Sequence, residues 1–194
     1  FDMLKKLELS QGAFKEIYDY CLKRKIDFLS TAFDLDSLNF ITKKLKINHL
    51  KIPSGELTNG PLLLEHALKA KKLFISTGLS TLEDIRKALG VVAFSYINNG
   101  EKPSSEAFKN SFDSTEGKKL LKKHVTLLHC TSAYPAPYEE INLNVIRRLK
   151  ETFNLEIGYS DHSLGIVVPV AAASIGAKVI EKHFTLDKSD EGPD

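Results

Sequence analysis

The sequence predicts an α/β fold built on a parallel sheet, and three observations support this prediction. Short apolar runs alternate with amphipathic helical patterns through most of the 194 residues. Cap residues and prolines stand where several helical patterns begin. Small polar or charged residues follow the apolar runs, as expected where the carboxyl ends of parallel strands share one site. Together these observations favour strands joined by helices that cover the outside of the sheet.

The elements follow one another in a regular order. The predicted strands are Ile26–Ser30, His49–Pro53, Leu73–Ser76, Val125–Cys130, Leu155–Gly158 and Lys178–His183. Helices are predicted around residues 12–24, 36–46, 61–70, 81–93, 142–152 and 165–175. Ser80-Thr-Leu-Glu83 has the pattern of a capping box, and Asn59-Gly-Pro61 places a cap residue and a proline at a helix start. Residues 98–116 are polar and rich in turn residues, so we expect a surface insertion there with at most a short helix at 104–111.

Six strand–helix units suggest an incomplete barrel. A TIM (β/α)8 barrel takes about 250 residues, and this chain has 194. We therefore expect residues 1–194 to form one partial barrel domain with about six of the eight βα units, lacking the first two strands. An open sheet edge is difficult to keep soluble, so we expect the chain to be a fragment of a longer protein.

Composition excludes several functional classes. The 27 basic and 25 acidic side chains are interspersed and give a formal net charge of +2, which argues against a nucleic-acid partner. No apolar run reaches the roughly 20 residues that cross a bilayer, so no membrane partner is expected. Cys21 and Cys130 lie far apart in the sequence and imply no disulfide framework. A reducing, cytoplasmic location fits this cysteine usage.

Two histidines stand at corresponding places after neighbouring predicted strands. His162 lies in Ile157-Gly-Tyr-Ser-Asp-His-Ser163, and His183 lies in Ile180-Glu-Lys-His-Phe-Thr185. Two imidazoles from neighbouring strand ends can share one divalent metal ion and leave positions open for substrate. The pattern therefore predicts a metal site. Other histidines carry less weight: we expect His66 to be exposed on a helix and His129 to serve packing or hydrogen bonding.

Hydroxyl groups, a lysine and glycine-exposed backbone amides follow the other strands, and these groups suit a phosphate. Lys51 and Ser54 differ in parity, so both reach one site only if the chain turns near Pro53-Ser54-Gly55. Glu181 shares a face with His183 and is expected either to orient that imidazole or to form an ion pair with a neighbouring strand. Lys182 is expected to point to the opposite face. Cys130 is expected to be a small core residue rather than a nucleophile.

Five motifs, in order over nearly the whole chain, resemble those of the sialic acid synthase family. They are Lys51-Ile-Pro-Ser-Gly-Glu56, Ile75-Ser-Thr-Gly78, Leu128-His-Cys-Thr-Ser-Ala-Tyr-Pro-Ala-Pro137, Gly158-Tyr-Ser-Asp-His-Ser163, and Glu181-Lys-His-Phe-Thr185 with Glu191-Gly-Pro-Asp194. The resemblance implies a TIM barrel with a C-terminal antifreeze-like domain, which works as a homodimer. It also implies condensation of phosphoenolpyruvate with a 2-acetamido hexose and release of phosphate. N-acetylmannosamine is the first candidate for this hexose. That antifreeze-like domain is absent from these 194 residues, so we expect the chain alone to be inactive.

The resemblance also assigns roles to single residues. It implies that His162 and His183 bind a divalent metal ion, Mn2+ or Mg2+, and that Glu56 transfers a proton or stabilises a developing cation. The substrate-binding residues implied by the family are Thr31, Lys51, Ser54, Ser76, Ser132, Tyr134, Ser160 and Asp194. Tyr134 and Asp194 from this list, together with Glu56, would lie near the sugar, and the other listed residues near phosphoenolpyruvate. Ser132 departs from the family pattern, because some members carry asparagine there, so its phosphate contact would be weaker or made differently.

Other functions remain open from the sequence. The same chemistry on a different sugar would make the protein a legionaminic or pseudaminic acid synthase. A metal-dependent aldolase would share the histidines without needing the phosphate-binding serines. A non-catalytic sugar-binding barrel is a further alternative.

Overall fold

A computed structural model of the chain describes residues 5–97 and 100–189. Its sheet has five parallel strands in the order β1-β2-β3-β4-β5. The strands are β1 His49–Ile52, β2 Lys72–Ser76, β3 Val125–Cys130, β4 Glu156–Asp161 and β5 Ile180–Lys182. Strands that follow one another in sequence are neighbours in space, as strand–helix–strand connections favour. The predicted parallel α/β class is confirmed.

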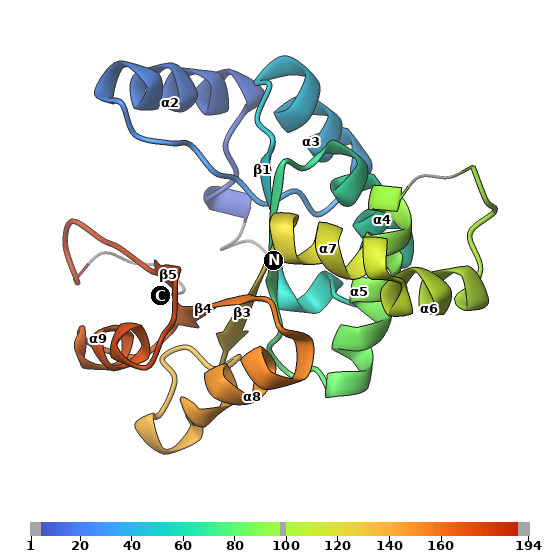
Figure 1. Cartoon of the computed structure of the whole chain (residues 1–194). Helices are drawn as coiled ribbons and strands as arrows, with labels where there is room; N and C mark the ends of the chain where they lie inside the picture. The colour runs from blue at the N-terminus through green and yellow to red at the C-terminus, as the bar shows by residue number, and fades with distance from the viewer. Residues whose placement is uncertain (1–4, 98–99, 190–194) are drawn as a thin grey trace.

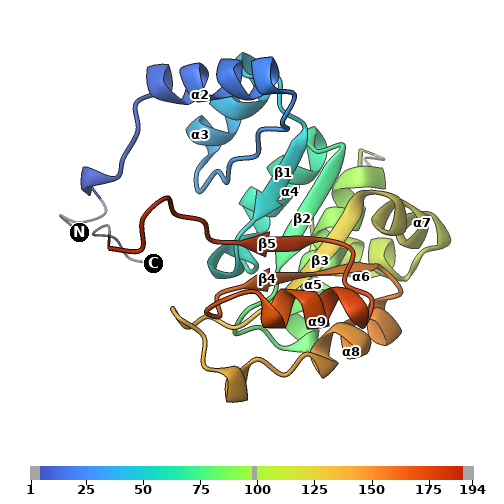
Figure 2. The same cartoon turned by 90° about the vertical axis from the view of Figure 1, so that its left-hand side faces the viewer.

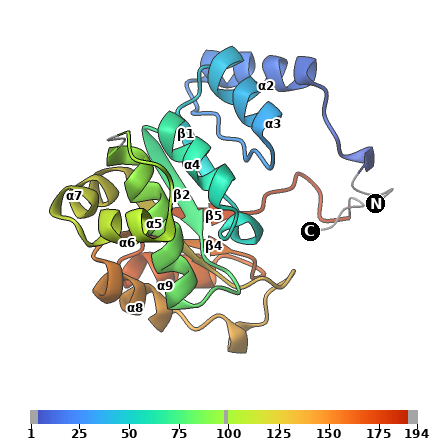
Figure 3. The ribbon, with the colours of Figure 1, turned by 90° about the vertical axis from the view of Figure 1, so that its right-hand side faces the viewer.

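Helices connect the strands and cover the outside of the sheet (Figures 1 and 3). Before β1 lie α2 Gln11–Arg24, α3 Leu35–Asn39 and a π-helical turn Phe40–Lys44. The later helices are α4 Gly60–Lys69, α5 Leu82–Ile97, α6 Ser105–Asp113, α7 Thr115–His124, α8 Asn144–Phe153 and α9 Val167–Ser174. Two short 3₁₀ turns, Ser54–Glu56 and Tyr138–Glu140, follow β1 and β3. Within the described ranges, no helix is both long and apolar enough to cross a membrane.

The sheet is strongly curved, and one ion pair demonstrates it. In a flat sheet β1 and β5 would lie about 19 Å apart, because neighbouring strands are separated by about 4.8 Å. Nevertheless Lys51 on β1 contacts Glu181 on β5, with the lysine Nζ 2.5 Å from a carboxylate oxygen. Figure 2 shows the same curvature, with β4 and β5 running across the direction of β1 and β2. The fold is therefore a parallel half-barrel whose concave face gathers side chains from both edges.

The core lies between this sheet and its helices. Leu50, Ile52, Leu73, Ile75 and Leu127 are almost completely buried strand residues. β3 is buried along its whole length, as expected for the central strand of a parallel sheet covered on both faces.

The predicted first strand, Ile26–Ser30, is wrong. Residues 26–30 carry no strand hydrogen bonds in the structure, and Ile26 is 62% exposed. A strand exists only through pairing with a neighbour, and within the described residues the sheet begins at β1. Instead, edge-to-face ring contacts of Phe28 with Phe14 and Tyr18 hold this segment against α2. The described residues therefore form five strands where the sequence predicted six.

Residues 100–116, the part of the polar segment that the structure describes, are largely helical. The short helix expected at 104–111 is present as α6, capped by Ser104. It packs against α5 through an edge-to-face contact of Phe94 with Phe108. No helix was predicted at α7, in which Gly117 and Leu121 are the buried residues.

Two local predictions are resolved at the level of single hydrogen bonds. Asn59 caps α4, since its side chain accepts from the amide of Leu62. The capping box of α5 is shifted by one residue from the predicted position. It joins Thr81 and Asp84, whose side chains and amides bond reciprocally at 3.0 and 3.1 Å.

Candidate active site

The candidate side chains gather at the carboxyl ends of the strands. In the parallel register Ser160 pairs with Glu181 and Asp161 with Lys182, so His162 and His183 follow as the next corresponding positions. The imidazole centroids of the two histidines lie 5.4 Å apart. The structure therefore confirms that these two side chains, 21 positions apart in sequence, meet at one place.

The orientation of the His162 ring is fixed from two sides. Its Nδ1 lies 2.6 Å from the carbonyl oxygen of Thr131, and because a carbonyl only accepts, this nitrogen carries the proton. In the neutral ring the lone pair is then on Nε2, which lies 3.5 Å from Ser160 Oγ. The Tyr134 ring stacks on the imidazole at 4.1 Å between centroids. This tautomer presents Nε2 to the concave face as a ligand or hydrogen-bond acceptor.

The donor set suits a divalent metal ion, although it is small. His162 and His183 offer nitrogen ligands, so Mn2+ or Mg2+, which prefer oxygen ligands, would also need water or substrate oxygens beside the two imidazoles. Among the described residues there is no cluster of three or more His, Cys, Asp or Glu side chains that would enclose a metal ion. A metal ion held by these two imidazoles would therefore keep several positions for water or substrate, as open catalytic sites do.

Lys51, Glu181 and Ser160 form a second group beside the histidines. Lys51 Nζ lies 2.5 and 2.6 Å from the two carboxylate oxygens of Glu181, and Ser160 Oγ donates to Glu181 at 2.6 Å. Burial raises the pKa of Glu181, but the bonds from Lys51 and Ser160 outweigh it and hold the pKa below its usual range. Glu181 therefore forms the cross-strand ion pair that the sequence allowed, and it positions a cation and a hydroxyl at once.

A third group surrounds Gly78, just after β2. Ser54 Oγ accepts from the Gly78 amide at 2.9 Å and lies 3.1 Å from Cys130 Sγ. A Cβ on Gly78 would collide with Ser54, Cys130 and Ser132, so only glycine permits this close approach. The 3₁₀ turn after Pro53 brings Ser54 into this group, which is the turn that the parity of Lys51 and Ser54 required.

Ser76, at the end of β2, is 3% exposed, and its hydroxyl lacks a hydrogen-bond partner among the described atoms. An unpaired buried hydroxyl costs free energy unless a water or a ligand meets it. This position therefore fits a ligand oxygen.

The other predicted residues are less closely joined to this site. Glu56 is half-buried on the 3₁₀ turn and accepts a 2.8 Å hydrogen bond from Asn59 Nδ2. Thr31 is half-buried in the segment after α2, and no hydrogen bond in the described ranges joins it to the other candidates. Asp194 lies outside the described residues.

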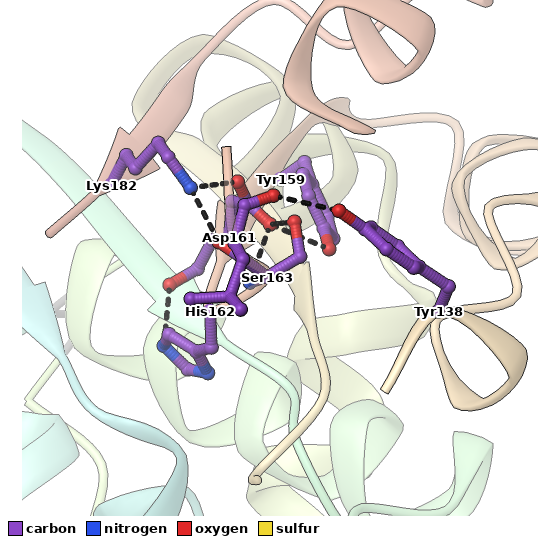
Figure 4. A network of polar contacts seen from close by, with 8 residues as sticks. Tyr138, Tyr159, Asp161, His162, Ser163 and Lys182 are labelled. Atoms are coloured by element: carbon purple, nitrogen blue, oxygen red, sulfur yellow. Dashed lines mark hydrogen bonds and ion pairs between the residues drawn. The ribbon is translucent and has the colours of Figure 1, made fainter. Parts of the chain in front are cut away.

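Sequence reasoning missed Asp161 and Lys182 as site residues (Figure 4). Asp161 is completely buried and Lys182 Nζ lies 2.5 Å from its carboxylate. Burial raises the pKa of Asp161, but hydrogen bonds from Lys182 and Ser163 outweigh it and keep the pKa low. The signal was present in Asp161-His-Ser163, because an acid two residues before a hydroxyl favours a local side-chain turn.

The predictions for the other histidines and for Cys130 were partly right and partly wrong. His129 is buried and bonds the Ile141 carbonyl at 2.7 Å, which confirms its packing role. Cys130 is buried as expected, beside Ser54. His66 is completely buried, so its predicted exposure was wrong; α4, which carries it, packs against α5. A surface cavity of about 650 Å³ lined by Arg86, Phe112 and Lys122 contains none of the candidate residues.

A polar site at the carboxyl edge of a curved parallel sheet is the arrangement of an α/β-barrel enzyme. The model of the NeuB family matches residues 1–194, so the chain belongs to the NeuB family. The N,N'-diacetyllegionaminic acid synthase of Campylobacter jejuni subsp. jejuni is 44% identical over 192 residues, which cover 99% of this chain and 50% of that protein. The N-acetylneuraminate-9-phosphate synthase of Drosophila melanogaster is 32% identical, covering 97% of this chain and 44% of that protein.

A similar solved structure also comes from a sialic acid synthetase. The crystal structure of the N-acetylneuraminic acid (sialic acid) synthetase from Leptospira borgpetersenii serovar Hardjo-bovis, in complex with citrate, is similar with a TM-score of 0.77. The sequence identity is 31%, and the match covers 96% of this chain and 56% of that one. The chain spans about half the length of the curated relatives it matches.

Proposed function

We propose that the full-length protein condenses phosphoenolpyruvate with an N-acetylated amino sugar to form a nine-carbon sialic acid-type product, with release of phosphate. The observation that carries this proposal is the meeting of the Lys51–Glu181–Ser160 group with the histidine pair at one edge of the sheet. Membership of the NeuB family supports it. A metal-dependent aldolase would need no site for phosphate, whereas this edge carries a lysine and several hydroxyls.

Phosphoenolpyruvate would bind at the Lys51 side of the site. Lys51 supplies the positive charge, and the hydroxyls of Ser54, Ser76 and Ser132 donate to phosphate or carboxylate oxygens. Lys51 is 13% exposed and paired with Glu181, so ligand binding would require it to share its charge between the carboxylate and the phosphate. Ser160 and Thr31 complete the residues that we assign to this substrate.

The sugar would bind beside the histidines. His162 and His183 would hold Mn2+ or Mg2+, and the bound ion would polarise the aldehyde carbonyl of the open-chain sugar. Tyr134, stacked on His162, offers a flat ring and a hydroxyl to the sugar, and we assign Asp194 to the same substrate. The enol carbon of phosphoenolpyruvate forms the new carbon–carbon bond, water adds to the neighbouring carbon, and the bond to phosphate then breaks. We assign proton transfer, or stabilisation of the developing positive charge, to Glu56, which lies on the turn after β1.

The comparisons favour a sugar other than N-acetylmannosamine, the first candidate from the sequence. The chain is 44% and 42% identical to two N,N'-diacetyllegionaminic acid synthases, but about 32% identical to N-acetylneuraminate-9-phosphate and pseudaminic acid synthases. We therefore propose a diacetamido hexose as the preferred acceptor and retain N-acetylmannosamine as the second candidate. We further propose that the full-length protein acts as a homodimer, which light scattering coupled to size exclusion would test.

The deciding experiment measures phosphate released from phosphoenolpyruvate by the full-length protein with Mn2+, using N-acetylmannosamine and diacetamido hexoses in parallel. We expect release with one sugar, and its loss on chelation and in His183→Ala. His49→Ala is the matched control, because His49 is exposed at the opposite end of β1. Carbon–carbon bond formation with pyruvate in place of phosphoenolpyruvate, and therefore without phosphate, would instead indicate an aldolase. Sugar binding without any turnover would indicate a non-catalytic barrel.

A further inference from the structure

The residues that immediately precede the two site histidines are bonded to each other. Asp161 precedes His162 on β4, and Lys182 precedes His183 on β5. These two residues face one another in the strand register, and Lys182 Nζ lies 2.5 Å from Asp161 Oδ2. The carboxylate is completely buried, whereas the lysine side chain is 27% exposed.

Successive register positions on β4 and β5 alternate between the two faces of the sheet. Ser160 and Glu181 bond each other on the concave face, at 2.6 Å. Asp161 and Lys182 pair on the opposite face, and the histidines return to the concave face with 5.4 Å between their ring centroids. The ion pair therefore lies directly behind the position where the two imidazoles meet.

The same pair fixes the backbone on both sides of His162. Asp161 Oδ1 accepts from the Ser163 amide at 2.9 Å and from its hydroxyl at 2.6 Å. Lys182 Nζ also donates to the Ser163 carbonyl at 2.7 Å. Figure 4 shows these bonds converging around the turn that carries His162. Because both neighbours of His162 are held, the backbone that carries its imidazole is held as well.

A purely stabilising role does not explain why these positions carry charge. Apolar residues of similar volume often stabilise a buried site as well as an ion pair does, because burying charge requires removing its water. A charged pair, however, specifies one geometry, since each hydrogen bond has a preferred distance and direction. The strict geometry suits a task that depends on the relative placement of two side chains.

We propose that Asp161 and Lys182 form a positioning clamp, which sets the spacing of His162 and His183 for a shared divalent metal ion. The proposal rests on the metal site in the proposed function. Groups that orient metal ligands typically change metal affinity by about 10- to 100-fold when they are removed. The clamp side chains lie on the face of the sheet opposite the imidazoles, so they act through the two histidines.

The test measures Mn2+ affinity of the full-length protein without substrates, from the electron paramagnetic resonance signal of free Mn2+. We expect Lys182→Met and Asp161→Asn to weaken binding by about 10- to 100-fold. The control is Lys72→Met, which removes a cross-strand ion pair with Glu156 at the other end of the same sheet, with a 3.2 Å contact. It should leave Mn2+ affinity within about twofold of the wild type. If Asp161→Asn fails to fold, Lys182→Met alone tests the proposal, because the Lys182 side chain is partly exposed.

A second readout needs no metal ion. In metal-free protein labelled with 15N-histidine, the ring resonances of His162 should shift in Lys182→Met and stay unchanged in Lys72→Met. If wild-type protein binds Mn2+ but Lys182→Met binds it equally well with unshifted resonances, the clamp is refuted and the proposed function stands. If wild-type protein binds no Mn2+, the metal site fails, and the clamp fails with it as a metal-positioning device.

Discussion

Replacing Gly78 by alanine would test the proposed phosphate site most directly. A Cβ at this position would lie 2.9 Å from both Ser54 Oγ and Cys130 Sγ, and closer still to Ser132 Oγ. These atoms are the ends of short side chains, so they are expected to rotate away rather than prevent folding. Overpacking of this kind typically lowers the free energy of unfolding by about 1 to 3 kcal/mol.

The larger expected effect of Gly78→Ala is on substrate binding. The displaced hydroxyls of Ser54 and Ser132 are those we assign to phosphoenolpyruvate. A hydrogen bond to a charged group contributes about 1.5 to 3 kcal/mol, which corresponds to about tenfold to a hundredfold in affinity. Because this loss affects bound substrate and transition state alike, KM for phosphoenolpyruvate should rise by that factor while kcat changes less.

The assay is steady-state phosphate release in the full-length protein, with phosphoenolpyruvate varied at saturating sugar. Gly60→Ala is the matched control, because a Cβ on Gly60 would meet no atom within 4 Å. Its KM should equal that of the wild type. If Gly78→Ala folds normally and keeps KM for phosphoenolpyruvate within about twofold of the wild type, the hydroxyls around Gly78 do not hold this substrate and our assignment is wrong.

Three further predictions follow from individual side chains. Ser76→Ala should leave the thermal unfolding temperature unchanged or slightly higher, since its buried hydroxyl lacks a partner within the described chain, yet it should raise KM for phosphoenolpyruvate about tenfold; a marked loss of stability would contradict this. Glu181→Gln should lower the free energy of urea unfolding by about 1 to 2 kcal/mol, less than a fully buried pair because Glu181 is 36% exposed, and an unchanged value would show that Lys51 needs no counterion. Burial lowers the pKa of His66 below its unfolded value of 6.5. The contribution of neutral His66 to stability is therefore complete above that pH and is lost as pH falls through the folded pKa. His66→Gln should reduce the loss of stability measured by urea unfolding between about pH 7 and pH 5, and an identical pH profile would refute it.

The strands that could be predicted were those whose burial and polar ends appear together in the local sequence. β1 to β5 all lie within two or three residues of the predicted runs. Alternation along β5 correctly placed Glu181 and Lys182 on opposite faces, because side chains of a strand alternate whatever the rest of the fold. The histidine pair was predictable for the same reason: equal positions on neighbouring parallel strands must meet.

The predictions that failed concern features that depend on neighbouring segments of the fold or on a choice between adjacent residues. Residues 26–30 have strand-like composition but no strand beside them, and composition cannot supply a partner. His66 was predicted to be exposed because the local sequence does not show which helix packs against α4, and α4 packs against α5. The capping box moved from Ser80 to Thr81 because both positions offer a hydroxyl three residues before an acid.

The sequence by itself determined the fold class, the edge of the sheet that carries the chemistry, and the residue types found there, because these follow from local periodicity and from the common direction of parallel strands. Only the tertiary structure decided which of these residues bond one another. Curvature of the sheet brought Lys51 to Glu181 from opposite edges, and strand register joined Asp161 to Lys182 behind the histidines. Such pairings depend on angles accumulated over many residues, whereas each local pattern depends on only a few.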